Sequence, residues 1–122
     1  MAVELSSARK HLQARIDGMA STWLDLHRKA EADVRVIIAM IIERYKPQRI
    51  YQWGSVLNPA SFRDYSDIDI ALEGLGHPMD LLHILRDAET LTDFPLDIVE
   101  LEKIDPIHAE SIRSKGKCVY ER

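Results

Sequence analysis

Residues 54–69, which read GSVLNPASFRDYSDID, join two apolar runs of the sequence. The stretch opens with a Gly-Ser pair that ends the first run, and it closes with Asp67 and Asp69 inside the second. Residues two apart on a strand project from the same face of a sheet. We therefore expect both carboxylates on one face, with Ile68 and Ile70 on the other face, toward a core.

A third acid, Asp97, lies in the similar apolar run LDIVEL. Carboxylates held close together repel each other, and a cation or a shared proton relieves that repulsion. Three such carboxylates beside a Gly-Ser turn would form an oxygen-lined site suited to a hard divalent ion and its phosphate ligands. The alternative is an acidic turn in which Asp67 caps a loop and Asp69 is solvated at a strand edge.

Length and composition favour one soluble globular domain. The chain has 122 residues, of which 46% are hydrophobic and 30% are charged, and its formal net charge is -4. This charge does not favour nonspecific binding to nucleic acid or to anionic membranes. Cys118 is the single cysteine, which excludes an intramolecular disulfide and suits a reducing compartment. The first residues lack the apolar core of a signal peptide, and no stretch approaches a membrane span, so we expect a cytoplasmic protein.

An apolar stripe at spacings of three and four predicts that residues 4–46 are helical. Pro47 ends the region, because the residue before a proline avoids helical backbone angles. One unbroken helix would span on the order of 60 Å, which is roughly twice the width of a small domain. The positions in the stripe are Leu5, Ala8, Leu12, Ile16, Met19, Trp23, Leu26, Ala30, Val34, Ile37, Ile41 and Tyr45.

That length favours a break near Asp17-Gly18, since glycine costs about 1 kcal/mol relative to alanine inside a helix. We expect two helices, with Ser21 capping the second one over residues 21–45, which packs on the sheet. The apolar stripe before Gly18 then needs a cover. Either it folds back on its own domain or it contacts another chain.

The rest of the chain predicts a small α/β (α+β) domain with a mixed sheet of three to four strands. The expected elements are strands over 49–53, 67–73 and 96–101, a helix opening at His77-Pro78, a helix after Asp105-Pro106 that Gly116 closes, and a short tail strand within 117–122. We treat 1–122 as one domain with a helical region, 1–46, and a sheet-bearing core, 47–122.

These motifs resemble the nucleotidyltransferase fold of the DNA polymerase β superfamily. The resemblance rests on Gly54-Ser55, on Ser66-Asp67-Ile68-Asp69 and on Asp97 in a later strand. The short chain is similar to the minimal, MNT-type members. The resemblance implies that Asp67 and Asp69 hold two magnesium ions, that Asp97 shares one of them, and that Gly54 and Ser55 bind the terminal phosphates of ATP or another nucleoside triphosphate.

The chemistry of such a transfer suits these residue types. Attack on the α-phosphorus builds negative charge, which two metal ions about 3.5–4 Å apart can stabilise. A metal-bound Asp97 would also accept the proton of the attacking hydroxyl. Glycine at position 54 lets the backbone approach the phosphates without a Cβ, and the Ser55 hydroxyl donates to phosphate oxygens.

The residues after Ser55 depart from the family pattern. Members commonly continue with a small residue and an arginine or a second glycine, whereas this chain continues with Val56, Leu57 and Asn58. Eleven residues separate Ser55 from Asp67, one more than the family spacing. Arg63 is the candidate to replace the missing phosphate-binding arginine.

The resemblance implies a magnesium-dependent enzyme that moves AMP from ATP to an acceptor hydroxyl. The acceptor would be a tyrosine of a HEPN-type toxin, with this chain as its antitoxin. The alternative is a catalytically weakened protein that neutralises its partner by masking it. The N-terminal helix would then contact that partner, or a second copy of this chain. The five histidines are scattered without zinc-ligand spacing, and we expect them to lie on the surface or to be satisfied in the core.

Overall fold

A computed structural model describes the backbone of residues 2–63 and 66–122, and in the first helix it leaves out the side chains of residues 2–7, 13–14, 16–17 and 19–21. The expected mixed α/β fold is confirmed. The elements are α1 (Ala2–Tyr45), β1 (Arg49–Trp53), the short 3-10 turn η1 (Ser55–Leu57), β2 (Ile68–Glu73), α2 (Asp80–Glu89), β3 (Leu96–Glu100), α3 (Pro106–Lys115) and β4 (Lys117–Glu121).

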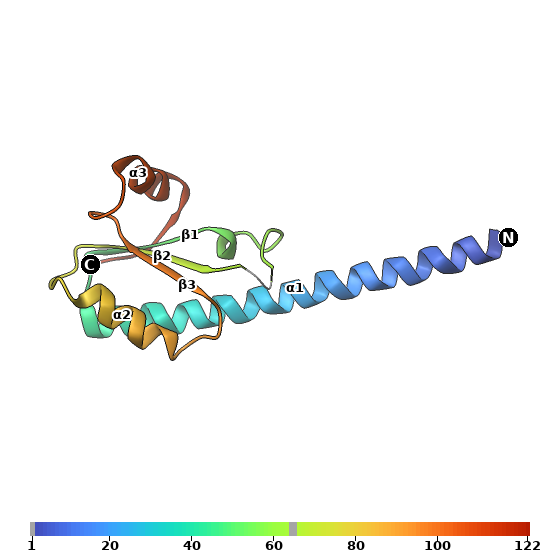
Figure 1. Ribbon diagram of the computed structural model, residues 1–122, viewed down its shortest axis with the longest axis horizontal. Coiled ribbons are helices and arrows are strands. Elements are labelled where there is room, and N and C mark those ends of the chain that lie inside the picture. Colours follow the sequence, from blue (N-terminus) through green and yellow to red (C-terminus); the bar gives the residue numbers. More distant parts are fainter. Residues whose placement is uncertain (1, 64–65) are drawn as a thin grey trace.

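The four strands form one mixed sheet in the order β3-β2-β1-β4. Strand β1 runs antiparallel to both β2 and β4, whereas β2 and β3 are parallel. Helices α1 and α2 lie on one side of the sheet and α3 lies on the other (Figure 1). The chain therefore forms three layers, and the tail strand expected from the sequence is the fourth strand, β4.

Alternation along β2 divides the core between the two faces of the sheet. Ile68, Ile70 and Leu72 are fully buried in a cluster that includes Ile37 and Ile41 of α1. These three residues alternate with Asp69 and Ala71, which face the other side of the sheet, as a period of two residues predicts for a strand.

A smaller cluster lies under α3. Ala71 of β2 is buried there together with Leu101, Ala109 and Ile112. A small residue at position 71 allows the short helix to approach the sheet closely, because little side-chain volume separates them.

The predicted break near Asp17-Gly18 is wrong. Helix α1 is continuous over 44 residues, so Ser21 does not cap a second helix. A glycine lowers helix stability without removing a backbone hydrogen bond, so it weakens the helix less than a proline would. In addition, the Thr22 hydroxyl donates to the Gly18 carbonyl at 2.9 Å, one turn away.

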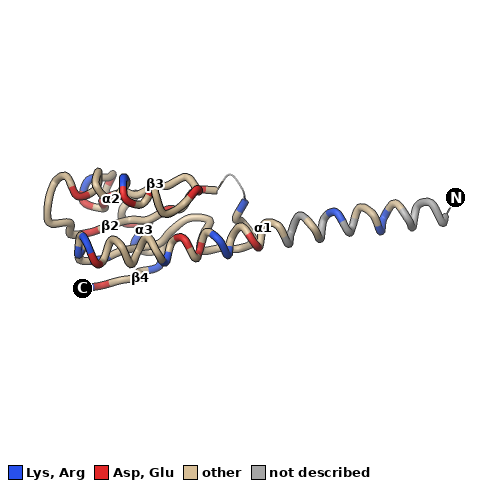
Figure 2. Tube along the Cα trace, turned by 90° about the horizontal axis from the view of Figure 1, so that it is seen from below, with Lys and Arg blue, Asp and Glu red and all other residues tan. Residues whose placement is uncertain are grey.

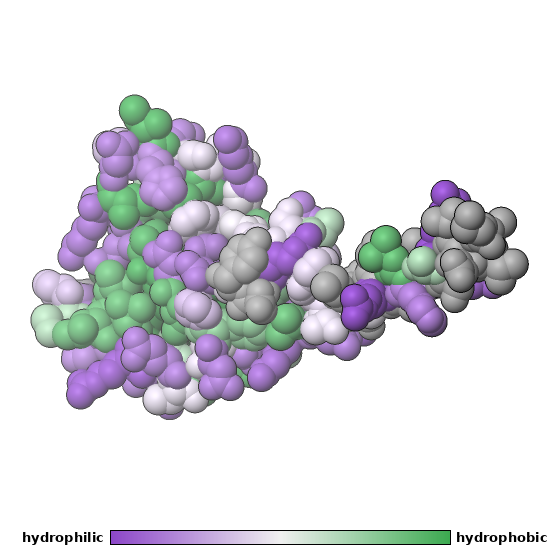
Figure 3. Space-filling view, turned by 45° about the vertical axis from the view of Figure 1, so that its right-hand side comes forward, coloured by the Kyte–Doolittle hydropathy of each residue, from purple (hydrophilic) through white to green (hydrophobic). Residues whose placement is uncertain are grey.

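The N-terminal half of α1 projects beyond the sheet (Figure 1). Leu12 is 59% exposed on this part of the helix. Apolar side chains are visible on the projection in Figure 3, and Figure 2 shows basic residues along it. The predicted stripe members Leu5, Ile16 and Met19 lie outside the described side chains. The described part of the chain has no helix long and apolar enough to cross a membrane.

Prolines were expected near the start of two later helices, at Pro78 and Pro106. The predicted start at Pro78 is wrong, since α2 begins at Asp80. A turn precedes it, closed by the Asp80 N–H donating to the His77 carbonyl at 3.0 Å. By contrast, α3 begins at Pro106, directly after Asp105, as expected. The Asp105 carboxylate caps it by accepting a hydrogen bond from the Ile107 N–H at 2.8 Å.

Continuity of α1 predicts opposite effects for two substitutions at Gly18. A Cβ at this position would meet no atom within 4 Å. Gly18→Ala should therefore stabilise the helix locally by about 1 kcal/mol. Gly18→Pro should break or kink it, because proline lacks the N–H and clashes with the preceding turn. Amide hydrogen exchange across residues 15–22 measures both effects. Equal exchange in the two variants would contradict an unbroken helix.

Candidate functional site

The parallel pairing of β2 with β3 brings two of the predicted acids together. Asp69 and Asp97 are direct partners in the register, so their side chains leave the same face of the sheet. Both lie on the face that carries α3, opposite the buried Ile68 and Ile70. Asp67 stands one residue before β2, and its negative charge contributes to the raised pKa of Asp69.

The end of β1 places Gly54 against the same carboxylate. Trp53, the last residue of β1, pairs with Asp69. Gly54 then has a φ of 79°, which side-chain-bearing residues rarely adopt. A Cβ on Gly54 would lie 2.9 Å from Cγ of Asp69 and would collide with its Oδ2. Only glycine allows this close approach between the backbone and the carboxylate.

Gly54 and η1 together form what we call the Gly-Ser turn, residues 54–57. The Leu57 N–H donates to the Gly54 carbonyl at 3.2 Å, and the Asn58 N–H donates to the Ser55 carbonyl at 3.0 Å. Val56 points into the core. The turn therefore places Ser55 one residue beyond the contact between Gly54 and Asp69.

Asp69 is buried among like charges. Its side chain is only 9% exposed. Burial, followed by the negative charges of Asp97 and then Asp67, raises its pKa from 3.8 to about 7. A bound cation would reverse this repulsion, because an opposite charge stabilises the ionised form.

The donor set fits magnesium in its chemistry. Hard divalent ions take carboxylate oxygens and keep several waters, and here Asp97 and Asp67 both act electrostatically on Asp69. Among residues 2–63 and 66–122, however, no group of three or more His, Cys, Asp or Glu side chains is already arranged to hold a metal ion.

Arg63 contacts helix α1 and its own loop. Its guanidinium lies 4.1 Å from the centre of the Trp23 ring of α1. One of its nitrogens, Nη1, donates to the carbonyls of Ala60 and Phe62 at 2.9 and 2.7 Å. Arg63 thus holds the loop against α1, and phosphate binding by this side chain stays a prediction.

Two neighbours of the site carried no clear sequence signal. Trp53 shares the face of Asp69, and its ring meets His108 of α3 edge to face at 5.5 Å. Within the described residues, the Trp53 Nε1–H is the one buried side-chain polar atom without a hydrogen-bond partner. His27 bonds the Val56 carbonyl from α1. Neither contact follows from sequence spacing, since both depend on how the layers pack.

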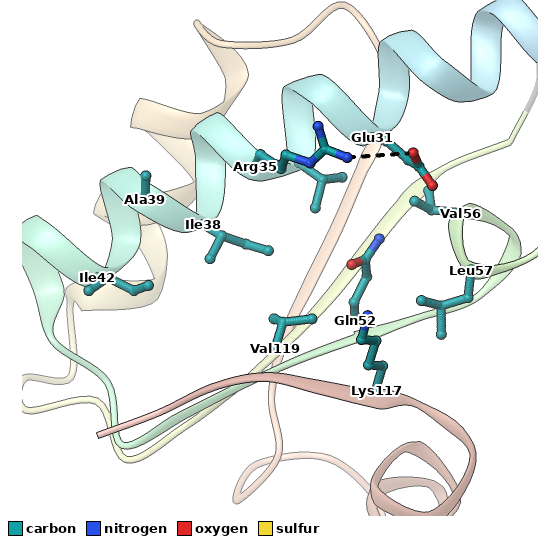
Figure 4. A pocket seen from close by; sticks show the side chains of 11 residues that line it. Glu31, Arg35, Ile38, Ala39, Ile42, Gln52, Val56, Leu57, Lys117 and Val119 are labelled. Atoms are coloured by element: carbon teal, nitrogen blue, oxygen red, sulfur yellow. Dashed lines mark ion pairs between the residues drawn. The ribbon is translucent and has the colours of Figure 1, made fainter.

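A groove of about 550 Å³ lies on the other face of the sheet, between α1 and strands β1 and β4 (Figure 4). Ile38 and Ile42 line it from α1, and Val119 lines it from β4. Val56 and Leu57 also border it, so the Gly-Ser turn separates this groove from the aspartates. The groove is therefore not the site that the three acids form.

The sequence and the fold were compared with those of known proteins. Residues 36–122 match the family described as Polymerase beta, Nucleotidyltransferase. No curated protein matches the sequence.

Solved structures share the fold. The MntA-HepT toxin-antitoxin has 20% identity and a TM-score of 0.57, over 75% of this chain and 73% of that chain. A toxin-antitoxin with AMP-PNP has 21% identity and a TM-score of 0.58, over 70% and 72%. A tri-AMPylated Shewanella oneidensis HEPN toxin in complex with MNT antitoxin has 20% identity and a TM-score of 0.53, over 79% and 73%.

The contact between Gly54 and Asp69 predicts that Gly54→Ala destabilises the fold. The new Cβ collides with the carboxylate and strains the backbone at positive φ, so we expect a loss of about 1–3 kcal/mol. Denaturant unfolding measures the change. Gly76→Ala is the matched control, because a Cβ there meets no atom within 4 Å. Equal unfolding free energies for the two variants would contradict the close contact.

The pKa of Asp69 predicts a pH-dependent stability in the absence of divalent cations. Between about pH 4 and pH 7 the folded protein keeps a proton that the unfolded chain releases, so stability from this group is complete below pH 4 and is lost as the pH rises to about 7. Asp69→Asn should remove this loss, which amounts to as much as about 4 kcal/mol. Denaturant unfolding in EDTA from pH 4 to pH 8 checks it. A constant difference between wild type and variant over that range would refute the raised pKa.

Proposed function

This chain belongs to the polymerase β nucleotidyltransferase family, and we propose that it transfers AMP from ATP to an acceptor hydroxyl. The observation that carries the proposal is the position of Asp69. Its buried carboxylate stands beside Asp97 in the sheet and against the backbone of Gly54. This arrangement supports the proposal, because carboxylates are the ligands that magnesium prefers and a glycine backbone leaves room for a phosphate group.

In this proposal Asp67, Asp69 and Asp97 hold two magnesium ions. When bound, these ions neutralise charge on the triphosphate and on the entering and leaving oxygens. The raised pKa of Asp69 supports the assignment, because burial and then the charges of Asp97 and Asp67 disfavour the ionised carboxylate, and a bound cation would stabilise that ionised form.

The protein groups have distinct tasks in the transfer. Gly54 leaves room for the β- and γ-phosphates, and the Ser55 hydroxyl donates to their oxygens. A carboxylate oxygen of Asp97 takes the proton of the acceptor hydroxyl. The acceptor oxygen forms a bond to the α-phosphorus while the bond to the bridging oxygen breaks, and pyrophosphate leaves with that electron pair. Arg63 would join the phosphate contacts only by leaving the Trp23 ring.

The proposed acceptor is a tyrosine of a HEPN-type toxin, which makes this chain an antitoxin. Support comes from the fold shared with MNT antitoxin in complex with an AMPylated HEPN toxin. The projecting part of α1, with exposed Leu12, offers a surface for that partner or for a second copy of this chain.

Label transfer tests the enzymatic proposal. The chain is incubated with ATP labelled in the α-phosphate, magnesium and the product of the adjacent gene. We expect label on the partner with the wild type, and at least a hundredfold less with Asp69→Asn, because a metal ligand is lost. Asp93→Asn is the control, since this carboxylate is 97% exposed and pairs only with Lys29 in the described structure. Equal labelling by wild type and Asp69→Asn, or none with either, would end the enzymatic proposal.

A second function, neutralisation by binding alone, is favoured by the exposed helix and by the changed residues after Ser55. It predicts that neutralisation of the partner survives Asp67→Ala and Asp69→Ala. It also predicts that Leu12→Glu abolishes neutralisation while Lys10→Glu, a neighbouring change of charge, does not. Loss of neutralisation in the aspartate variants with partner binding intact would count against it.

A further inference from the structure

His27 of α1 is a buried titratable side chain for which the proposed chemistry has no use. It is 3% exposed. Its Nε2 lies 2.6 Å from the Val56 carbonyl oxygen, 29 residues along the chain. A carbonyl oxygen only accepts hydrogen bonds, so Nε2 carries the hydrogen.

The surroundings hold the imidazole in this position. Phe62, which is fully buried, meets the ring edge to face with centroids 5.5 Å apart. The Glu31 carboxylate is 3.6 Å from Nε2, which is longer than a hydrogen bond. The Val56 carbonyl is therefore the near partner of Nε2. A satisfied core histidine would have the same burial, so the role of His27 depends on the segment to which Val56 belongs.

Val56 lies at the centre of the Gly-Ser turn. The Gly54 and Ser55 carbonyls accept hydrogen bonds within the turn and from Asn58. The Val56 carbonyl is instead bonded from α1 by His27. On the other side, Gly54 packs against Asp69. Ser55 thus sits between two anchors, one on the sheet and one on the helix.

We propose that His27 is a positioning residue that orders the Gly-Ser turn for the terminal phosphates of the nucleotide. The inference rests on the proposed function, since it assigns the turn to phosphate. A turn that is already ordered loses little conformational freedom when phosphate binds, whereas a loosened turn must be ordered at that moment and binds more weakly. The hydrogen bond from α1 keeps the turn in the ordered state.

Two near-isosteric substitutions separate the hydrogen bond from the packing. His27→Met removes the donor, and His27→Gln keeps an N–H at similar reach. We expect His27→Met to weaken AMP-PNP binding with magnesium about tenfold, and His27→Gln to stay within about threefold of wild type. Calorimetric titration measures both affinities. Equal weakening in the two variants would show that only the packing matters, and unchanged binding in both would overturn the proposal.

Amide exchange without nucleotide reports on the turn directly. In His27→Met we expect faster exchange at Leu57 and Asn58, whose N–H groups close the turn, and unchanged exchange at Ile70 in the sheet. A general loss of protection, Ile70 included, would indicate a structural role alone and would contradict the inference. Protection equal to wild type at Leu57 and Asn58 would also contradict it.

The outcomes distinguish this inference from the proposed function. A wild type that binds no AMP-PNP overturns the proposed function and the phosphate role of the turn. A wild type that binds, with His27→Met binding equally well, overturns the inference alone. If His27→Met does not fold, nitrogen NMR of the wild type tests the hydrogen bond to Val56, because it identifies which ring nitrogen of His27 carries the hydrogen. Hydrogen on Nε2 supports the bond to Val56, and hydrogen on Nδ1 alone refutes it.

Discussion

The parallel register that sets Asp69 beside Asp97 is the constraint on which the rest of the molecule depends. Two neighbouring carboxylates on one face repel each other, and burial of one of them adds a desolvation cost. That arrangement persists only because packing elsewhere holds the strands in place. Ile68 and Ile70, the neighbours of Asp69 on β2, are fully buried against the α1 layer. A slip of one residue would expose both of them to the opposite face, so the apolar pattern that builds the core also enforces the juxtaposition of the acids.

Exposure to solvent differs between the two ends of β2 on the face that carries α3. Ala71 is fully buried beneath α3, Asp69 is 9% exposed, and Asp67 is exposed. Helix α3 therefore covers one end of this face and leaves the end with the acids accessible. The short side chain at position 71 lets the helix close over the sheet, while the absence of a side chain at position 54 lets the Gly-Ser turn approach Asp69. Small residues thus create the close cover at one end and the close backbone approach at the other.

Sequence patterns predicted the parts of this structure that local rules control. The strand over 49–53 was predicted with its observed bounds, and the family resemblance drawn from Gly54-Ser55 and the aspartates is confirmed. The break at Gly18 was wrong because a helix penalty of about 1 kcal/mol does not by itself end a helix. The contact of His27 with Val56 could not be predicted, since it joins residues 29 apart through tertiary packing. The site roles of Asp67, Asp69, Asp97, Gly54, Ser55 and Arg63 stay predictions.

Continuity of α1 links two features that the sequence pattern separated. The family match begins at residue 36, inside this helix. His27 and the projecting segment both lie before that point, yet His27 contacts the Gly-Ser turn at the centre of the family motif. The match therefore excludes a part of the chain that packs directly on the candidate site. The N-terminal helix is for this reason part of the site's support as well as an exposed surface.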